Sequence, residues 1–254
     1  MDTGCNIRTI VLCAGYGTRL GGLTHETPKP MLDIQNRPLL EYLLTHLARH
    51  GFREITVNLH FMPEQIQNYF GDGERCGVQI VYSQEDELLG TAGGAKKMET
   101  FLGESDSFLV QYGDILTDQN LTAMLAFHRE RGALATLLLH QRKRSNSIVS
   151  LDDSNRITGF LERPGEDAYK HIEWHWVNSA ICLCDREVLS HVPVNQPCDF
   201  PRDVFSKLVD TGRLYGFPLT GYRCAIDSPE RLEQARADVA AGRCQIDMPE
   251  QTQP

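Results

Sequence analysis

The sequence contains no apolar run that approaches the roughly 20 residues of a membrane-spanning helix. Its first residues, MDTGCNIR, lack the basic and apolar regions of a secretory signal peptide. Its eight cysteines include no CxxC pair, and their spacing does not predict a disulfide scaffold. These absences argue against membrane proteins and disulfide-stabilised secreted domains. They predict a cytoplasmic protein that has no membrane partner.

Basic residues are also in short supply. The chain has 25 lysines and arginines against 34 aspartates and glutamates, which gives a formal net charge of −9. A protein that follows the phosphates of a nucleic-acid polymer needs a basic face, so the sequence predicts no such partner. A small anionic substrate is not excluded, because it responds to local charge only.

What is present is the composition of an ordinary globular protein. The 254 residues are 41% hydrophobic, which is enough to bury a sizeable core. There are no internal repeats, long linkers or clear boundaries, so we expect one domain over residues 1–254. The last segment, 242–254, is polar, and we expect it to be a frayed tail.

Short β-branched runs alternate with segments of helical apolar spacing in the first half of the chain. The predicted strands cover residues 7–13, 54–59, 78–82, 108–112 and 135–140, and the predicted helices cover 38–49, 63–70, 91–102 and 121–131. This alternation predicts an α/β fold with a doubly wound, mostly parallel, Rossmann-like sheet.

The second half of the chain is less regular. The predicted strands cover 148–151, 157–162, 177–183 and 214–219, and the predicted helices cover 186–191, 203–210 and 229–241. The first two strands flank the turn DDSNR and are expected to pair with each other. This half therefore predicts a mixed-sheet part attached to the parallel sheet.

The stretch AGYGTRLGGLTHETPKPML follows the first predicted strand, at the place where α/β sheets bind ligands. We expect Gly15 and Gly17 to adopt positive φ and to form a backbone nest for an anion. A P-loop would need Lys and then Ser or Thr after the second glycine, but Thr18-Arg19 stands there; a dinucleotide loop would need a third glycine where Leu20 stands. The prolines that flank Lys29 stiffen its backbone, so this loop predicts an aimed lysine beside an arginine fork suited to phosphate.

Further motifs follow the loop in a fixed order. Together with GxGTRL at Gly15–Leu20 and PKP at Pro28–Pro30, the chain carries LGTAG at Leu89–Gly93, GD at Gly113-Asp114, an E-K-P variant at Glu162-Arg163-Pro164, an N-x-G variant at Asn178-Ser179-Ala180, and an altered D-x-G-T-P-E within Ala225–Glu230. By these motifs, residues 7–241 resemble the sugar-1-phosphate nucleotidyltransferases, or NDP-sugar pyrophosphorylases. The run YSQEDELLGTAGGAKK looks most like the mannose- and heptose-1-phosphate guanylyltransferases.

The resemblance implies a GT-A-like nucleotidyltransferase fold, in which residues 7–140 form the nucleotide-binding half and 141–241 the sugar-phosphate-binding half. The implied substrates are a nucleoside triphosphate and a sugar 1-phosphate, and the products are an NDP-sugar and pyrophosphate. Arg19 would hold the leaving pyrophosphate, and Lys29 would contact the transferred α-phosphate. The implied nucleotide-binding residues are Leu12, Ala14, Gly15, Gly17, Thr18, Glu85, Gly90 and Thr91, and the implied sugar-phosphate-binding residues are Gly113, Glu162, Arg163 and Asn178.

The implied cofactor is Mg²⁺, which prefers carboxylate and phosphate oxygens. Asp114 is the first candidate ligand and Asp227 the second. At the closing motif the chain departs from the family, because Ala225 stands where the aspartate is usual and Asp227 stands on the usual glycine. We therefore expect Asp227 to act as a shifted metal ligand.

The identity of the base is a separate prediction. A carboxylate at Glu85 could accept both the N1 and N2 protons on the Watson–Crick edge of guanine, whereas uracil and thymine offer only one donor there. This favours GTP, although the acidic run Glu85–Glu87 is also typical of a solvated loop. UTP, dTTP or CTP, and a different sugar or a non-sugar phosphate, are the alternatives within the family.

Two other functions compete with transfer. A catalytically silent nucleotide-sugar-binding regulator would fit the altered Asp227 region, but Arg19, Lys29 and Asp114 are all retained. A nicotinamide-dependent oxidoreductase lacks the third glycine and the acid expected at the end of the second strand. The acceptor sugar is not indicated, and a homo-oligomer is compatible with the sequence.

Overall fold

The computed structural model describes residues 7–170 and 173–249. The strands are β1 (Arg8–Leu12), β2 (Asp33–Ile34), β3 (Arg37–Pro38), β4 (Glu54–Leu59), β5 (Gln79–Gln84), β6 (Ser107–Tyr112), β7 (Ile115–Thr117), β8 (Ala135–Arg142), β9 (Ser147–Leu151), β10 (Ile157–Glu162), β11 (His175–Asp185), β12 (Leu214–Pro218) and β13 (Arg223–Ala225). The α-helices are α1 (Leu39–Arg49), α2 (Pro63–Phe70), α3 (Gly90–Lys97), α4 (Glu99–Leu102), α5 (Leu121–Glu130), α6 (Ser206–Leu208) and α7 (Pro229–Ala240).

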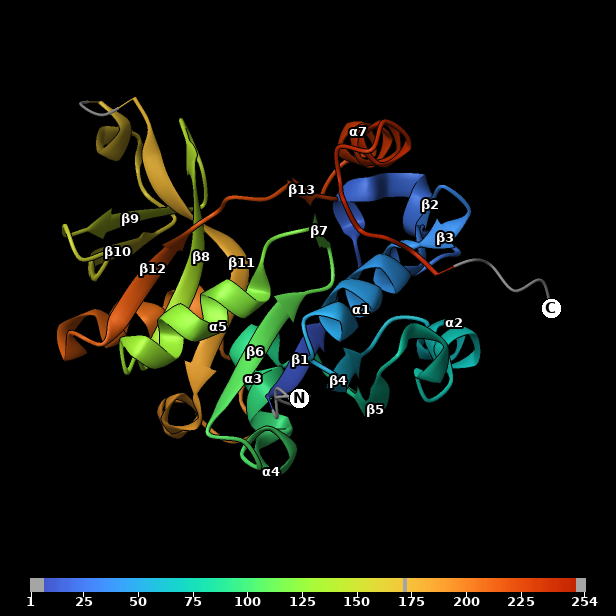
Figure 1. Ribbon diagram of the computed structural model, residues 1–254, viewed down its shortest axis with the longest axis horizontal. Helices are drawn as coiled ribbons and strands as arrows, with labels where there is room; N and C mark the ends of the chain where they lie inside the picture. The colour runs from blue at the N-terminus through green and yellow to red at the C-terminus, as the bar shows by residue number, and fades with distance from the viewer. Residues whose placement is uncertain (1–6, 171–172, 250–254) are drawn as a thin grey trace.

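A mixed sheet of nine strands runs through the described part of the molecule (Figure 1). Its strands β5, β4, β1 and β6 lie side by side and are parallel, as the alternating first half predicts. Strand β11 follows β6 and is antiparallel to it, and β8 and β12 continue the sheet beyond β11. The antiparallel hairpin of β9 and β10 branches from the start of β11. The expected α/β fold with a mixed-sheet part is confirmed.

Several details differ from the sequence-based expectation. The fifth predicted strand is not a direct parallel neighbour of the fourth, because β11, from the irregular half of the chain, is inserted between them. The helix expected at 91–102 is divided at Met98, whose φ of −99° and ψ of 22° lie outside the helical region. The segment 186–191 is a 3₁₀ helix, and the helix expected at 203–210 is a π-helical turn at Phe200–Phe205 followed by α6 and a 3₁₀ turn.

Two small ribbons are absent from the sequence prediction, namely the pairs β2–β3 and β7–β13. Their strands are only two or three residues long, too short for a period of two to be visible. The second ribbon matters for the site. It joins the segment after β6 to the segment before α7, although about 100 residues separate them along the chain.

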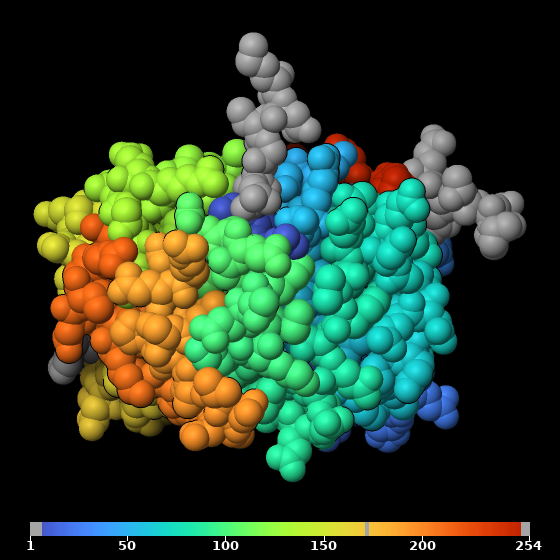
Figure 2. Space-filling model, turned by 90° about the horizontal axis from the view of Figure 1, so that it is seen from below, coloured from blue at the N-terminus to red at the C-terminus, as the bar shows by residue number. Residues whose placement is uncertain are grey.

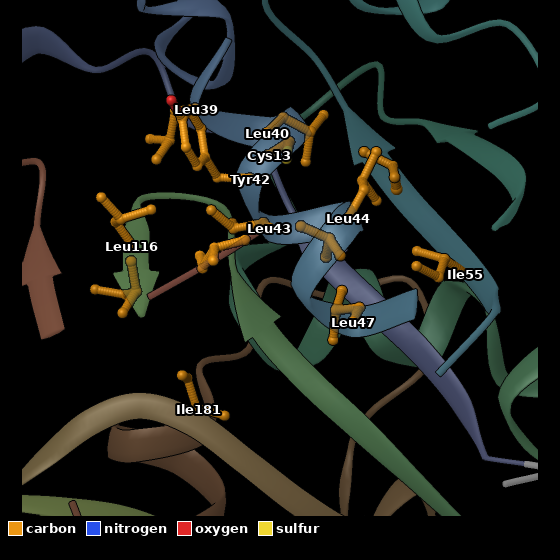
Figure 3. Packing of buried hydrophobic residues seen from close by; sticks show 14 of the residues in the cluster. Cys13, Leu39, Leu40, Tyr42, Leu43, Leu44, Leu47, Ile55, Leu116 and Ile181 are labelled. Atoms are coloured by element: carbon orange, nitrogen blue, oxygen red, sulfur yellow. The ribbon is translucent and has the colours of Figure 1, made fainter. Parts of the chain in front are cut away.

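The two faces of the sheet carry two hydrophobic clusters. One cluster lies between the sheet and helices α1, α2, α5 and α7, and the other between the sheet and α3, α4 and the 186–208 segment. Figure 3 shows α1 in the first cluster, with Leu44 and Leu47 above the strands between Ile55 of β4 and Leu116 of β7. Each fully buried leucine side chain contributes about 1.5–3 kcal/mol to stability. On the opposite side, the segments around α3 and 186–205 lie next to each other at the surface (Figure 2).

The seven cysteines that the structure describes are buried, and none of them forms a disulfide. Cys5 lies outside the described residues. Burial raises the pKa of Cys13, so its thiol stays protonated at neutral pH. These cysteines act as small apolar groups, and the absence of disulfides among them agrees with their spacing in the sequence.

The expectation of a frayed tail is not met over 242–249. Cys244 and Ile246 are buried against the first cluster, and the backbone N–H of Gln245 donates a hydrogen bond of 2.8 Å to Asp118. The alternation of apolar residues with polar ones in this segment hid its packing role. Residues 250–254 lie outside the described part. No helix in the described ranges is long and apolar enough to cross a membrane.

Candidate functional site

A cavity of about 330 Å³ opens at the carboxyl ends of β1, β4, β5 and β6. This is the edge at which parallel α/β sheets bind their ligands. The structure brings most of the predicted site residues together in its walls: Leu12, Ala14, Gly15, Gly17, Thr18, Arg19, Lys29, Glu85, Gly90, Thr91, Gly113, Asp114 and Asp227. The assembly of residues from five separate stretches of the chain makes this the candidate active site.

The glycine loop forms one wall of the cavity. Gly17 has a φ of +67°, and its carbonyl accepts hydrogen bonds from the N–H of Leu20 at 2.9 Å and from the hydroxyl of Thr24 at 3.2 Å. The expected positive φ is confirmed at Gly17 but is wrong at Gly15, because the turn needs only one left-handed residue. Gly15 is exposed, with open space where a side chain would start, so it leaves the backbone accessible.

Arg19 stands on the 3₁₀ turn η1 (Thr18–Thr24) that follows the loop. Its side chain is exposed, and none of the described carboxylates forms an ion pair with it. A guanidinium without a partner at the mouth of a cavity is available to an anionic ligand.

Lys29 and Asp114 form an ion pair of 2.6 Å between Nζ and Oδ2. Lys29 begins the short 3₁₀ turn η2 (Lys29–Met31), where Pro28 and Pro30 fix the backbone on both sides. Its side chain is only 15% exposed. The lysine is therefore already held in one position in the ligand-free protein, as the flanking prolines predict. Lys29 is the predicted phosphate contact and Asp114 the predicted metal ligand, so the ion pair places these two residues in direct contact.

Asp227 is held near Asp114 by the ribbon of β7 and β13. The N–H of Ile226 donates a 2.9 Å hydrogen bond to the carbonyl of Asp114, and Asp227 is the next residue along the chain. Ala225, which stands at the family's usual aspartate position, pairs with Ile115 in this ribbon. Both carboxylates line the same cavity.

A cluster of three or more His, Cys, Asp or Glu side chains that could hold a metal is not found within 7–170 and 173–249. Mg²⁺ is commonly held by one or two carboxylates together with substrate phosphates and water. The two aspartates therefore fit Mg²⁺ as far as the protein ligands are concerned, and the remaining positions would be filled by the nucleotide.

The sequence predicts that the Glu85 carboxylate accepts hydrogen bonds from the base, but in the structure this carboxylate is buried and bonded to the protein. Its side chain is 2% exposed, and its two carboxylate oxygens accept hydrogen bonds from the amide of Asn58 at 2.8 Å and from the N–H of Leu89 at 3.0 Å. The side-chain oxygen of Asn58 accepts a hydrogen bond of 2.7 Å from the backbone N–H of Cys13. Glu85 thus ties the LGTAG segment to β4 and, through Asn58, to the glycine loop.

Replacing Glu85 with glutamine tests whether it anchors this segment. One acceptor oxygen becomes a donor that faces either Asn58 or the N–H of Leu89, so we expect the free energy of unfolding to fall by about 1–3 kcal/mol. We also expect kcat/KM to fall by the same factor with GTP and with UTP. A loss confined to GTP would show instead that Glu85 reads the base.

The LGTAG segment packs closely against residues 198–200 and is hydrogen-bonded to them. Gly90 has a φ of +73°, and a side chain there would lie 2.7 Å from the carbonyl oxygen of Cys198. The hydroxyl of Thr91 donates to Asp199 at 3.3 Å and accepts from the N–H of Phe200 at 2.8 Å. Gly90 is therefore required by both conformation and space, and the wall of the cavity depends on a distant segment.

Tyr112, the last residue of β6, also lines the cavity. Its hydroxyl is buried and has no hydrogen-bond partner within the described part of the chain. Burial raises its pKa, so the group is a neutral donor. The side chain of Thr91, which also lines the cavity, acts on this pKa in the opposite direction. An unpaired buried hydroxyl costs free energy, so we expect a bound ligand to pair with it.

The change Tyr112→Phe separates a binding role from a structural one. No hydrogen bond of the ligand-free protein is lost, so we expect the free energy of unfolding to change by less than about 0.5 kcal/mol. The KM for the nucleotide or for the acceptor should rise by up to about tenfold, the equivalent of one hydrogen bond. Unchanged KM values for both substrates would contradict this role.

The predicted sugar-phosphate residues beyond Gly113 do not line this cavity. Glu162 is half-buried. Burial raises the pKa of its carboxyl group, and the nearby charge of Arg163 lowers it. Arg163 is exposed with a φ of +51°. The side-chain oxygen of Asn178 accepts a 3.0 Å bond from the N–H of Ala180 and closes a bulge in β11. Glu162 ends β10, and this strand contacts the Phe200–Phe205 turn that follows Asp199.

Three residues of the site were missed in the sequence. Asn58 is the bridge between the glycine loop and Glu85, Tyr112 carries the unpaired hydroxyl, and Asp199 holds Thr91. Asn58 and Tyr112 end or nearly end predicted strands, a position that signals a ligand edge in a parallel sheet. Asp199 gives no comparable signal.

The chain is similar to known proteins over most of its length. The family model described as nucleotidyl transferase matches residues 8–230. The UTP–glucose-1-phosphate uridylyltransferase of Synechocystis sp. is 39% identical over 220 residues, covering 81% of this chain and 56% of that protein. The mannose-1-phosphate guanylyltransferase of Mycobacterium tuberculosis is 31% identical over 240 residues, covering 93% of this chain and 65% of that protein. This chain therefore spans less than two thirds of the length of either relative.

Among solved structures, HddC from Yersinia pseudotuberculosis complexed with GMP-PN superposes with a TM-score of 0.76 at 20% identity, covering 92% of this chain and 99% of that one. That likeness supports the fold. The resemblance to sugar-1-phosphate nucleotidyltransferases that the motifs indicate is confirmed by the family model and by both relatives. The chain belongs to the nucleotidyl transferase family.

Proposed function

We propose that this protein transfers a nucleotidyl group from a nucleoside triphosphate to a sugar 1-phosphate and releases pyrophosphate. The observation that carries the proposal is the Lys29–Asp114 pair of 2.6 Å in the same cavity as the glycine loop, the exposed Arg19 and Asp227. Nucleotidyl transfer requires phosphate contacts and metal ligands, and these four residues would supply both in one site.

The chemistry needs little from the protein beyond position and charge. The second pKa of a phosphate monoester is about 6, so the attacking oxygen of a sugar 1-phosphate is already ionised near pH 7 and no general base is needed. Lys29 would neutralise the α-phosphate as it is attacked, and Arg19 would hold the leaving pyrophosphate. The open backbone at Gly15 would let the triphosphate approach the loop.

Asp114 and Asp227 would hold Mg²⁺. Bound there, the ion supplies charge neutralisation between the donor phosphates. Asp114 pairs with Lys29 in the ligand-free protein, so one carboxylate would serve both cations, and the lysine would be left near the phosphate oxygens.

GTP is our proposed donor. The support is the similarity to mannose-1-phosphate guanylyltransferases. UTP is the second candidate, because the Synechocystis relative with 39% identity is named a uridylyltransferase. The engaged oxygens of Glu85 do not separate the two bases.

The experiment is pyrophosphate release over a matrix of GTP, UTP, dTTP and CTP against sugar 1-phosphates, with Mg²⁺ present. We expect release with at least one sugar 1-phosphate and the highest kcat/KM with GTP. A clear lead for UTP, dTTP or CTP would overturn the GTP preference and leave transfer in place. Release with no combination would favour a nucleotide-sugar-binding regulator.

A further inference from the structure

A second cavity of about 460 Å³ lies beside the end of β8, away from the glycine loop. Its walls come from β8 and the residues after it, from Trp174 just before β11, from the β12–β13 connection, from β13 and from α7. Its lining comprises His140, Gln141, Arg142, Lys143, Arg144, Trp174, Leu219, Arg223 and Arg231. None of these described lining residues is acidic, in a chain whose net charge is −9.

Three arginines of this lining, Arg142, Arg223 and Arg231, form what we call the arginine pocket. No carboxylate within 7–170 and 173–249 forms an ion pair with any of the three. The Nε of Arg223 donates a 3.2 Å hydrogen bond to the carbonyl of Ser179 on β11. By contrast, Arg144 at the rim already has a bidentate pair with Glu166.

The like charges in the pocket act on one another. Burial is the main cause that lowers the pKa of Arg223 to about 10; the carboxylate of Asp114 acts against this shift, and Arg142 and Arg231 add to it. Burial and the same three arginines lower the pKa of His140 to about 3, so this imidazole is neutral. Like charges gathered in one pocket repel one another, and an anion bound among them would reduce this repulsion.

We propose that the arginine pocket binds a phosphate-class anion, that is, a phosphate monoester or a related tetrahedral oxyanion carried by a small molecule. Three guanidinium groups provide planar forks that match tetrahedral oxygens from several sides. The cavity volume is larger than a bare ion needs. Trp174 offers a half-exposed ring at the rim for the organic part of the ligand.

The pocket shares no lining residue with the first cavity, although the carboxylate of Asp114 in that cavity acts on the pKa of Arg223. Residues 138–142 alternate along β8, so His140 and Arg142 share the face of Leu138, which packs in the cluster with α1 and α7. The opposite face packs against α3 and the 186–208 segment. In the proposed reaction the phosphates of the donor would be held by Arg19 and Lys29, which line the first cavity.

The pocket nevertheless has a structural path to the first cavity. Arg223 starts β13, whose partner strand follows Asp114, and Asp227 stands four residues after Arg223. Arg223 also bonds to the strand position next to Asn178. An anion here could therefore be a second phosphate on the acceptor itself or a separate phosphorylated metabolite that acts on the rate.

Binding can be tested without any enzymatic activity. The chain has two tryptophans, so the change Trp176→Phe leaves Trp174 as the only indole reporter. In this background we expect a saturable change of Trp174 fluorescence with inorganic phosphate and with glucose 1,6-bisphosphate. Arg142→Gln and Arg231→Gln should each raise the Kd at least about tenfold. Arg53→Gln, an exposed arginine outside the pocket, is the matched control and should leave the Kd unchanged.

Absence of a saturable signal, or equal Kd values in all variants, would overturn the proposal whether or not the protein transfers nucleotides. Kinetics then distinguishes the two sources. A second phosphate on the acceptor predicts a lower KM for glucose 1,6-bisphosphate than for glucose 1-phosphate, a difference that Arg142→Gln removes. A separate effector predicts that phosphate or the bisphosphate changes the rate with glucose 1-phosphate without being consumed.

Discussion

Replacing Lys29 with methionine is expected to lower kcat by about 100- to 1,000-fold, the loss typical of one preorganised group that stabilises charge in the transition state. Lys29 is fixed between two prolines and is 15% exposed, so its charge is positioned before the substrate arrives. Because the interaction would strengthen as pyrophosphate leaves, kcat should fall more than KM rises. Steady-state rates of pyrophosphate release measure both parameters.

The matched control is Lys207→Met, an exposed lysine on α6 that lies outside both cavities. It should retain the kcat of the unaltered protein. Thermal unfolding of the Lys29 variant shows whether the fold survives the loss of the pair with Asp114. Near-full kcat in a folded Lys29→Met protein would contradict the assignment of this residue to the transferred phosphate.

Changing Asp114 to asparagine is expected to reduce kcat by at least about 100-fold and to raise the Mg²⁺ concentration needed for half-maximal rate. Mutation of a residue that only orients a metal ligand lowers metal affinity or activity by about 10- to 100-fold. Loss of the ligand itself should therefore lower activity by at least the larger of these factors. Asparagine keeps the shape of the side chain and can still accept a hydrogen bond from Lys29. A Mg²⁺ titration of activity makes the measurement.

Asp227→Asn should also raise the Mg²⁺ requirement, by about tenfold, and Asp210→Asn, an exposed aspartate on the 3₁₀ turn after α6, should not. If Asp227→Asn leaves the Mg²⁺ titration unchanged, Asp227 is not a shifted metal ligand. The altered closing motif would then leave Asp114 as the protein's carboxylate for the ion.

The parallel part of the fold was predictable because its signals are local. Each of β1, β4, β5 and β6 is an apolar run followed by a turn and a helix, and this repetition alone indicates a doubly wound sheet. The insertion of β11 was not predictable, since antiparallel pairing depends on which distant strand fills the gap beside β6. The two- and three-residue ribbons carry no periodic signal at all.

The same difference applies to the site. Arg19, Lys29 and Asp114 lie in short motifs with fixed spacing, and the structure places them in one cavity. The role of Glu85 depended on its partners Asn58 and Leu89, which no motif joins to it. The arginine pocket likewise combines residues from three segments of the second half, and only the structure shows that they line one cavity.

The measurement that tests nucleotidyl transfer most directly is the simultaneous assay of pyrophosphate and NDP-sugar in one reaction. We expect the two products to form in equal amounts, and only when a nucleoside triphosphate, a sugar 1-phosphate and Mg²⁺ are all present. Pyrophosphate that forms without the sugar phosphate, or no product from the full matrix of donors and acceptors, would contradict the account.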